Sequence, residues 1–207
     1  MLTPVVRTLL LVNGLVFLGE LVYPTPLISW FALWPGGLLV TTGWSEGVPH
    51  FWPWQIVTYA FLHGGLLHLA LNMYALWLFG TRLEYVWGGR TFTVYYFSCV
   101  IGAALTQLVV SEIALLQGGA AYPVLGASGG VFGLLLAFGL LFPETELILL
   151  FPPIPIKAKW FVIGYGAVEL FAGVTGTMEG VAHFAHLGGM ATGYLLLRYW
   201  RRGPPGR

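Results

Sequence analysis

The residue best suited to do chemistry is Ser128, which lies in the run Gly126-Ala127-Ser128-Gly129-Gly130. The neighbouring positions carry almost no side chain, so the hydroxyl and the nearby amides are open to an approaching group. Such a run at the start of a helix suits an exposed nucleophile whose neighbouring amide faces an anion. The alternative is a packing role, because serine is common where membrane helices meet.

A base for this serine is predicted at His186. Ala182, His186, Gly189 and Gly193 follow the spacing i, i+4, i+7, i+11, which places them on one helical face. The imidazole therefore projects from a smooth stripe that allows another helix to come close. A serine hydroxyl needs a base within hydrogen-bonding distance to become a nucleophile. The alternative is a histidine that only hydrogen-bonds within a helix bundle.

Oxyanion stabilisation is predicted for His68 and Asn72, which are four residues apart and share a helical face. Both can donate hydrogen bonds to the oxyanion of an acyl-transfer intermediate. The alternative is a polar contact between helices. His63 lies off this face, and we expect it to be structural.

Two further polar groups have open assignments. His183 is either a supporting group beside His186 or an interfacial residue. Glu169 is the one carboxylate deep within an apolar run, and polar groups there are functional candidates. We favour a structural role for Glu169, since no sequence feature places it near His186.

Several chemistries are excluded or disfavoured. The sequence contains no Asp, which excludes a Ser–His–Asp triad and an aspartyl dyad. His183 and His186 lack the glutamate of an H-E-x-x-H zinc motif. A zinc site made by His68, His183 and His186 is possible in principle, but we expect no metal and no cofactor. Cys99 lies in mid-span and is interpreted as a small apolar filler.

The composition requires lipid as the solvent. Of 207 residues, 57% are hydrophobic and only 8% are charged, whereas soluble domains carry about 25% charge. A soluble globule could not hide that much apolar surface. The net charge of +1 and the one cysteine exclude nucleic-acid binding and a disulfide scaffold.

We expect an all-α polytopic fold with six spans in a single domain, 1–207, that ends in a short cytoplasmic tail, 201–207. A spanning helix needs about 20 mostly apolar residues. The predicted spans are 5–22, 65–85, 92–110, 127–142, 160–174 and 181–200. The long first connection, 23–62, is rich in Trp and Pro, which predicts an interfacial loop.

The basic residues orient these spans. With six spans, all nine Lys and Arg residues fall on one side, which places both termini in the cytoplasm. His68, Ser128 and His186 then each lie within about one or two turns of the outer surface. Three helices thus bring a His, a Ser and a His to one depth. We expect a water-filled cavity that opens outward above Ser128 and is closed below by apolar packing.

Together these motifs resemble the rhomboid family of intramembrane serine proteases. The matching pieces are His63-x4-His68-x3-Asn72, Gly126-Ala127-Ser128-Gly129 and Ala185-His186-x2-Gly189. The six spans and the long first loop extend the likeness over nearly the whole chain.

The resemblance implies a Ser–His dyad with Ser128 as nucleophile and His186 as general base, and no acidic third member. It also implies an oxyanion hole formed by His68, Asn72 and the Ser128 amide. The supporting residues would be Gly126, Gly129, Phe132, Gly189 and His63. Implied partners are transmembrane protein substrates, cut near the outer membrane face, and membrane lipids, with no nucleic acid and no metal.

The chain departs from the family pattern at two positions. Many relatives have Trp-Arg in the first loop where this chain has Trp54-Gln55, so the role of that arginine is missing or altered. Many also have a tyrosine one turn after the serine, and Phe132 keeps that ring without its hydroxyl.

The alternative function is a non-catalytic rhomboid-like protein that binds transmembrane helices. Such proteins typically lack the Ser or the His, and this chain has both. A transporter would predict polar groups along a path through mid-membrane, and these are sparse. For location we expect a prokaryotic inner membrane, because the tails are short and no targeting extension is seen.

Overall fold

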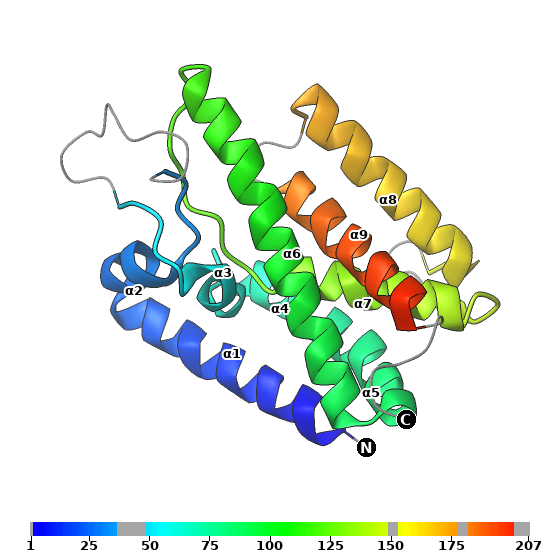
Figure 1. The fold of residues 1–207 in the computed structure, drawn as a ribbon. Helices are drawn as coiled ribbons and strands as arrows, with labels where there is room; N and C mark the ends of the chain where they lie inside the picture. Colours follow the sequence, from blue (N-terminus) through cyan, green and yellow to red (C-terminus); the bar gives the residue numbers. More distant parts are fainter. Residues whose placement is uncertain (1, 37–48, 149–152, 178–181, 201–207) are drawn as a thin grey trace.

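The structure, a computed structural model, describes residues 2–36, 49–148, 153–177 and 182–200, which are mainly helical (Figure 1). The predicted tail at 201–207 lies outside the described residues. The helices are α1 (Pro4–Val22), α2 (Pro24–Phe31), α3 (Gln55–Thr58), η1 (Tyr59–Phe61), α4 (Leu66–Ala75), η2 (Leu76–Gly80), α5 (Thr81–Trp87), α6 (Gly89–Leu116), α7 (Ser128–Leu141), α8 (Ala158–Thr175) and α9 (His183–Trp200). The π-helical turn η2 joins α4 to α5, so Leu66–Trp87 is one helical segment.

Each of the six predicted spans coincides with one of these helical segments. By length and composition, α1 and α6 are each able to cross a membrane. The pair Gln55–Phe61 and Leu66–Trp87, bent by 100°, passes the same test together, and α7 is an apolar helix of 14 residues. The described residues therefore support two spans, or three with the bent pair, and the count of six stays a prediction.

The first connection is more ordered than a plain loop, because it contains α2 and α3. Gln55 is fully buried at its centre. Its Oε1 accepts hydrogen bonds from the backbone N–H groups of Trp34 and Trp52, at 3.2 Å each, and its Nε2 donates to the Trp30 carbonyl at 3.3 Å. Gln55 therefore holds this connection together at the position where the family resemblance led us to expect an arginine.

A small hairpin is the exception to the all-α prediction. Strand β1 (Glu146–Ile148) pairs antiparallel with β2 (Pro155–Lys157). The prolines around this hairpin disfavour a helix in the same segment. Lys157 donates to Glu144 at 2.7 Å, and Lys159 also pairs with Glu144. These hydrogen bonds lower the pKa of the exposed Glu144 carboxyl to about 2, so the cluster stays charged at neutral pH.

In the described part of the chain, buried glutamates accept hydrogen bonds that hold both ends of α1 in place. Glu84 accepts the N–H groups of Val5 and Val6 at 2.9 and 2.8 Å, and thereby caps the first turn of α1. Glu20, near the other end of α1, accepts the His63 N–H at 3.0 Å. Both ends of α1 are thus tied to the segment around α4 and α5.

Helices α7 and α9 meet almost backbone to backbone. A Cβ atom placed on Gly189 would lie 2.0 Å from the carbonyl oxygen of Gly129, and one on Gly129 would lie 2.4 Å from Ala103 Cβ. A Cβ on Gly133 would meet Cys99 Sγ at 2.4 Å. The glycine stripe predicted on the last helix is therefore a packing surface, and α9 lies between α6, α7 and α8 (Figure 1).

Helix α7 is too short to cross a hydrocarbon core by itself. Its fourteen residues rise about 21 Å, and a hydrocarbon core is about 30 Å thick. Beyond the last residue of α7, Arg82 lies 5.1 Å over the Phe142 ring, and the charged Glu144 cluster follows. Ser128 and this charged cluster therefore lie at opposite ends of α7.

Gly189→Ala should destabilise the fold, because the added methyl group must push α9 away from α7. We expect a cost of roughly 1–3 kcal/mol, typical of overpacking. The matched control is Gly164→Ala on α8, where nothing lies within 4 Å of the added Cβ. Thermal unfolding in detergent checks this: equal midpoints for the two variants would show that the contact is not tight.

Candidate active site

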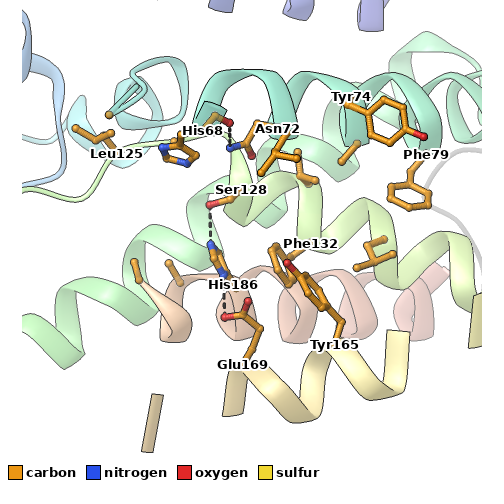
Figure 2. A pocket seen from close by; sticks show the side chains of 18 of the residues that line it. His68, Asn72, Tyr74, Phe79, Leu125, Ser128, Phe132, Tyr165, Glu169 and His186 are labelled. Carbon is orange, nitrogen blue, oxygen red and sulfur yellow. Dashed lines mark hydrogen bonds and ion pairs between the residues drawn. The ribbon is translucent and has the colours of Figure 1, made fainter. Parts of the chain in front are cut away.

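The structure brings Ser128 and His186 into direct contact. Ser128 Oγ lies 2.8 Å from His186 Nε2, and the two side chains come from α7 and α9 (Figure 2). Ser128 is also the first residue of α7. The first amides of a helix have no acceptor within the helix, so the N–H groups around Ser128 are available to an anion.

The segment before Ser128 is held by the first connection. Val124 and Leu33 exchange backbone hydrogen bonds, at 2.9 Å each, and the Gly126 N–H donates to the Tyr59 carbonyl at 2.9 Å. Gly126 has a φ of 127°, and a Cβ there would lie 2.8 Å from the His68 ring. Only glycine fits this position, which keeps the backbone beside Ser128 open.

A stack of rings holds the face of His186. The Phe132 ring lies 4.2 Å from the imidazole with an interplanar angle of 5°. Tyr165 of α8 stacks on the other side of Phe132 at 5.2 Å, and Phe161 follows at 5.6 Å from Tyr165. Phe132 therefore lies where the family resemblance implied, although Tyr165 was not anticipated.

The structure corrects the expectation for Glu169. Its Oε2 lies 2.9 Å from His186 Nδ1 and 2.7 Å from His183 Nδ1, so it is directly beside the predicted base (Figure 2). The side chains of Glu169, His183 and His186 are all buried. His183 is therefore a group beside His186 and not an interfacial residue. The depth argument applied to the other spans could have placed Glu169 at the level of His186, because Glu169 lies six residues before the C-terminal end of α8, but it does not show which face of α8 meets α9.

His68 and Asn72 line the same cavity as Ser128. Asn72 Nδ2 donates to the His68 carbonyl at 3.0 Å, which leaves its second N–H for another acceptor. The His63 ring packs edge-on against His68 with centroids 5.1 Å apart, and His63 is not among the residues that line the cavity. Its position agrees with the structural role expected for it.

The cavity beside Ser128 extends along α7 and has a mainly apolar lining. It has a volume of about 920 Å³ and runs from Gly126 and Ser128 along α7 to Leu135, Leu147 and Ile148. The cavity therefore continues past the level of Ser128, whereas we expected apolar packing to close it below that residue. Side chains of α4 line one side and those of α8 the other, so the cavity is a groove beside α7.

These groups are of the types that acyl transfer requires. A hydroxyl, a base and several potential hydrogen-bond donors line one cavity. Fold and site therefore define a helical membrane protein with a serine–histidine pair in a cavity between its helices.

The chain belongs to the rhomboid family and is an integral membrane protein. The family model described as the rhomboid domain matches residues 50–202, which include every site residue named above.

Three similar proteins illustrate the range of relatives. Rhomboid protein 1, mitochondrial, of Saccharomyces cerevisiae is 36% identical over 68% of this chain and 40% of its own length. Presenilin-associated rhomboid-like protein, mitochondrial, of Rattus norvegicus is 32% identical over 67% of this chain and 36% of its own length. Rhomboid protease GluP of Bacillus subtilis is 37% identical over 40% of this chain and 14% of its own length.

The chain thus spans less than half the length of these curated relatives. The mitochondrial names of two of them conflict with the predicted prokaryotic inner membrane. The coarser statement, an integral membrane protein, is the one that the family supports.

Ser128 should react with a serine-directed fluorophosphonate probe, because His186 Nε2 can accept its proton. We expect labelling to be lost in Ser128→Ala and His186→Ala. Ser111→Ala is the control, since Ser111 is buried on α6 and accepts a hydrogen bond from Gln107. In-gel fluorescence checks this, and equal labelling of all four proteins would mean that Ser128 is not activated.

Proposed function

We propose that this chain is an intramembrane serine endopeptidase that cleaves transmembrane helices of membrane proteins near the outer membrane face. The observation that carries the proposal is the 2.8 Å contact between Ser128 Oγ and His186 Nε2. Family membership adds support, since one relative bears the name of a rhomboid protease.

The reaction follows from the two atoms in contact. Ser128 Oγ bonds to the carbonyl carbon of the scissile peptide while its proton moves to His186 Nε2. The C–N bond then breaks as Nε2 returns that proton to the leaving amine. A water molecule then attacks the acyl-enzyme ester while the same nitrogen takes its proton. The bond between the acyl carbon and Ser128 Oγ breaks as Nε2 returns that proton to Oγ, which releases the second product as a carboxylic acid and restores the hydroxyl.

The oxyanion of each tetrahedral intermediate requires hydrogen-bond donors. We assign this role to the Ser128 amide, the second N–H of Asn72 and the His68 ring. The first lies at the start of α7, and the other two lie one turn apart on α4. Donors that are fixed before the reaction stabilise the charge that develops in the transition state.

The cavity supports an apolar, membrane-embedded substrate. Its lining is mainly apolar, and its polar groups gather around Ser128. A transmembrane helix shields its carbonyl groups by internal hydrogen bonds, so it must unwind locally before cleavage, which small residues near the cut would ease. Substrate proteins and lipids are the partners of this function, and the single six-span domain with cytoplasmic termini is its proposed setting.

Ser128→Ala and His186→Ala should each abolish cleavage of a transmembrane substrate in liposomes, because each removes an atom that forms or breaks a bond. Ser111→Ala again serves as the control and should cleave like the wild type. Product formation on gels provides the measurement. Cleavage that persists in both site variants, with substrate binding intact, would favour the non-catalytic helix-binding alternative.

Asn72→Ala should reduce kcat by an amount equivalent to about 2–4 kcal/mol of transition-state stabilisation, as for other oxyanion donors. Asn13→Ala is a matched control, because Asn13 makes the same bond to the carbonyl four residues earlier, at 2.8 Å on α1. Steady-state kinetics of both variants test the role. Unchanged kcat in Asn72→Ala would remove Asn72 from the oxyanion hole.

A further inference from the structure

Glu169 differs from the buried glutamates Glu20 and Glu84 in what it contacts. Glu20 and Glu84 accept hydrogen bonds from backbone N–H groups and hold the ends of α1. The Oε2 atom of Glu169 lies within hydrogen-bonding distance of two imidazole Nδ1 atoms, His183 at 2.7 Å and His186 at 2.9 Å. A buried carboxylate is costly in a membrane unless it is paired, so this arrangement calls for an explanation.

The contact determines the tautomer of His186. An ionised carboxylate only accepts hydrogen bonds, so each Nδ1 atom that contacts Glu169 carries a proton. In the neutral imidazole, His186 Nε2 is then the unprotonated nitrogen. This is the atom 2.8 Å from Ser128 Oγ, so the hydroxyl donates to it and the pair is ready for proton transfer.

The same carboxylate faces the charge that the reaction creates. When Nε2 takes the serine proton, His186 becomes an imidazolium cation whose Nδ1–H still donates to Glu169. A carboxylate at this distance stabilises the cation without itself being protonated. The Nδ1–H of His183, one turn before His186 on α9, holds the accepting oxygen in place.

A bound metal ion is the competing explanation, since the ligand atoms of Glu169, His183 and His186 all lie within 4.8 Å of one another. Ligands on a tetrahedral zinc ion stand about 3.4 Å apart, because each is about 2.1 Å from the metal. The distances of 2.7 and 2.9 Å are those of hydrogen bonds. The geometry therefore favours a proton-linked cluster.

We propose that Glu169 is a positioning residue that orients His186 toward Ser128 and stabilises its charged form, and that His183 anchors the Glu169 carboxylate. The inference rests on the proposed function. It replaces the two-residue dyad expected from the family resemblance with a Ser128–His186–Glu169 set, in which a glutamate from α8 takes the position that aspartate occupies in soluble serine proteases.

Glu169→Gln tests the proposal, because it keeps the shape of the side chain and removes its charge. We expect kcat on a transmembrane substrate to fall by about 100-fold or more, with KM nearly unchanged. Glu169→Asp, which retains a carboxylate on a shorter side chain, should recover part of this loss. The matched control is Glu84→Gln, which removes a buried carboxylate far from Ser128 and should keep the kcat of the wild type.

His183→Phe is the second variant, since it keeps a ring and removes the N–H that anchors Glu169. We expect kcat to fall by about tenfold, the effect of one hydrogen bond to a charged group. If Glu169→Gln fails to fold, as judged by its thermal midpoint, then Glu169→Ala and His183→Phe carry the comparison. Wild-type kcat in both would overturn the proposal.

Two outcomes separate this proposal from its alternatives. If Ser128→Ala is inactive but Glu169→Gln keeps the kcat of the wild type, the role of Glu169 is overturned and the proposed function stands. If Ser128→Ala is active, the proposed function itself is refuted. Activity that survives EDTA treatment agrees with the hydrogen-bonded cluster. Activity lost to EDTA and restored by Zn²⁺ would overturn the cluster in favour of a metal site.

Discussion

The close approach of α7 and α9 is the constraint on which the site depends. No side chain separates Gly129 from Gly189, and a single Cβ on Gly189 would lie 2.0 Å from the Gly129 carbonyl oxygen. Ser128 directly precedes Gly129, and His186 lies three residues before Gly189. The absence of side chains at the crossing is therefore what allows a hydroxyl on one helix to reach an imidazole on the other.

Much of the fold could be predicted because the signals are local. Apolar stretches of suitable length predicted the helical segments at all six positions. The restriction of Lys and Arg to alternate connections predicted a direction for each span, and this direction stays a prediction. Direction then implied the common depth of His68, Ser128 and His186. The rhomboid motifs strengthened this interpretation, and the family match includes all of them.

The remaining features depend on how helices rotate and pack, which local signals do not determine. α8 is apolar on most of its surface, so its sequence does not indicate which face meets α9, and the contact of Glu169 with His183 and His186 could not be read from it. The groove beside α7 likewise depends on the separation of α4 and α8. The hairpin β1–β2 is short and rich in proline, so it showed no clear alternation in the sequence.

The ring stack and Glu169 have a common consequence, since both attach the imidazole of α9 to α8. The side chains of Ser128, His186 and Glu169 come from three helices whose relative positions depend on tertiary contacts. Helices in lipid keep their own backbone hydrogen bonds when they separate. The proposed turnover would therefore cease in a harsh detergent while the helical content stays intact, so that activity would report on how α8 packs in the bundle and not on how much of the chain is folded.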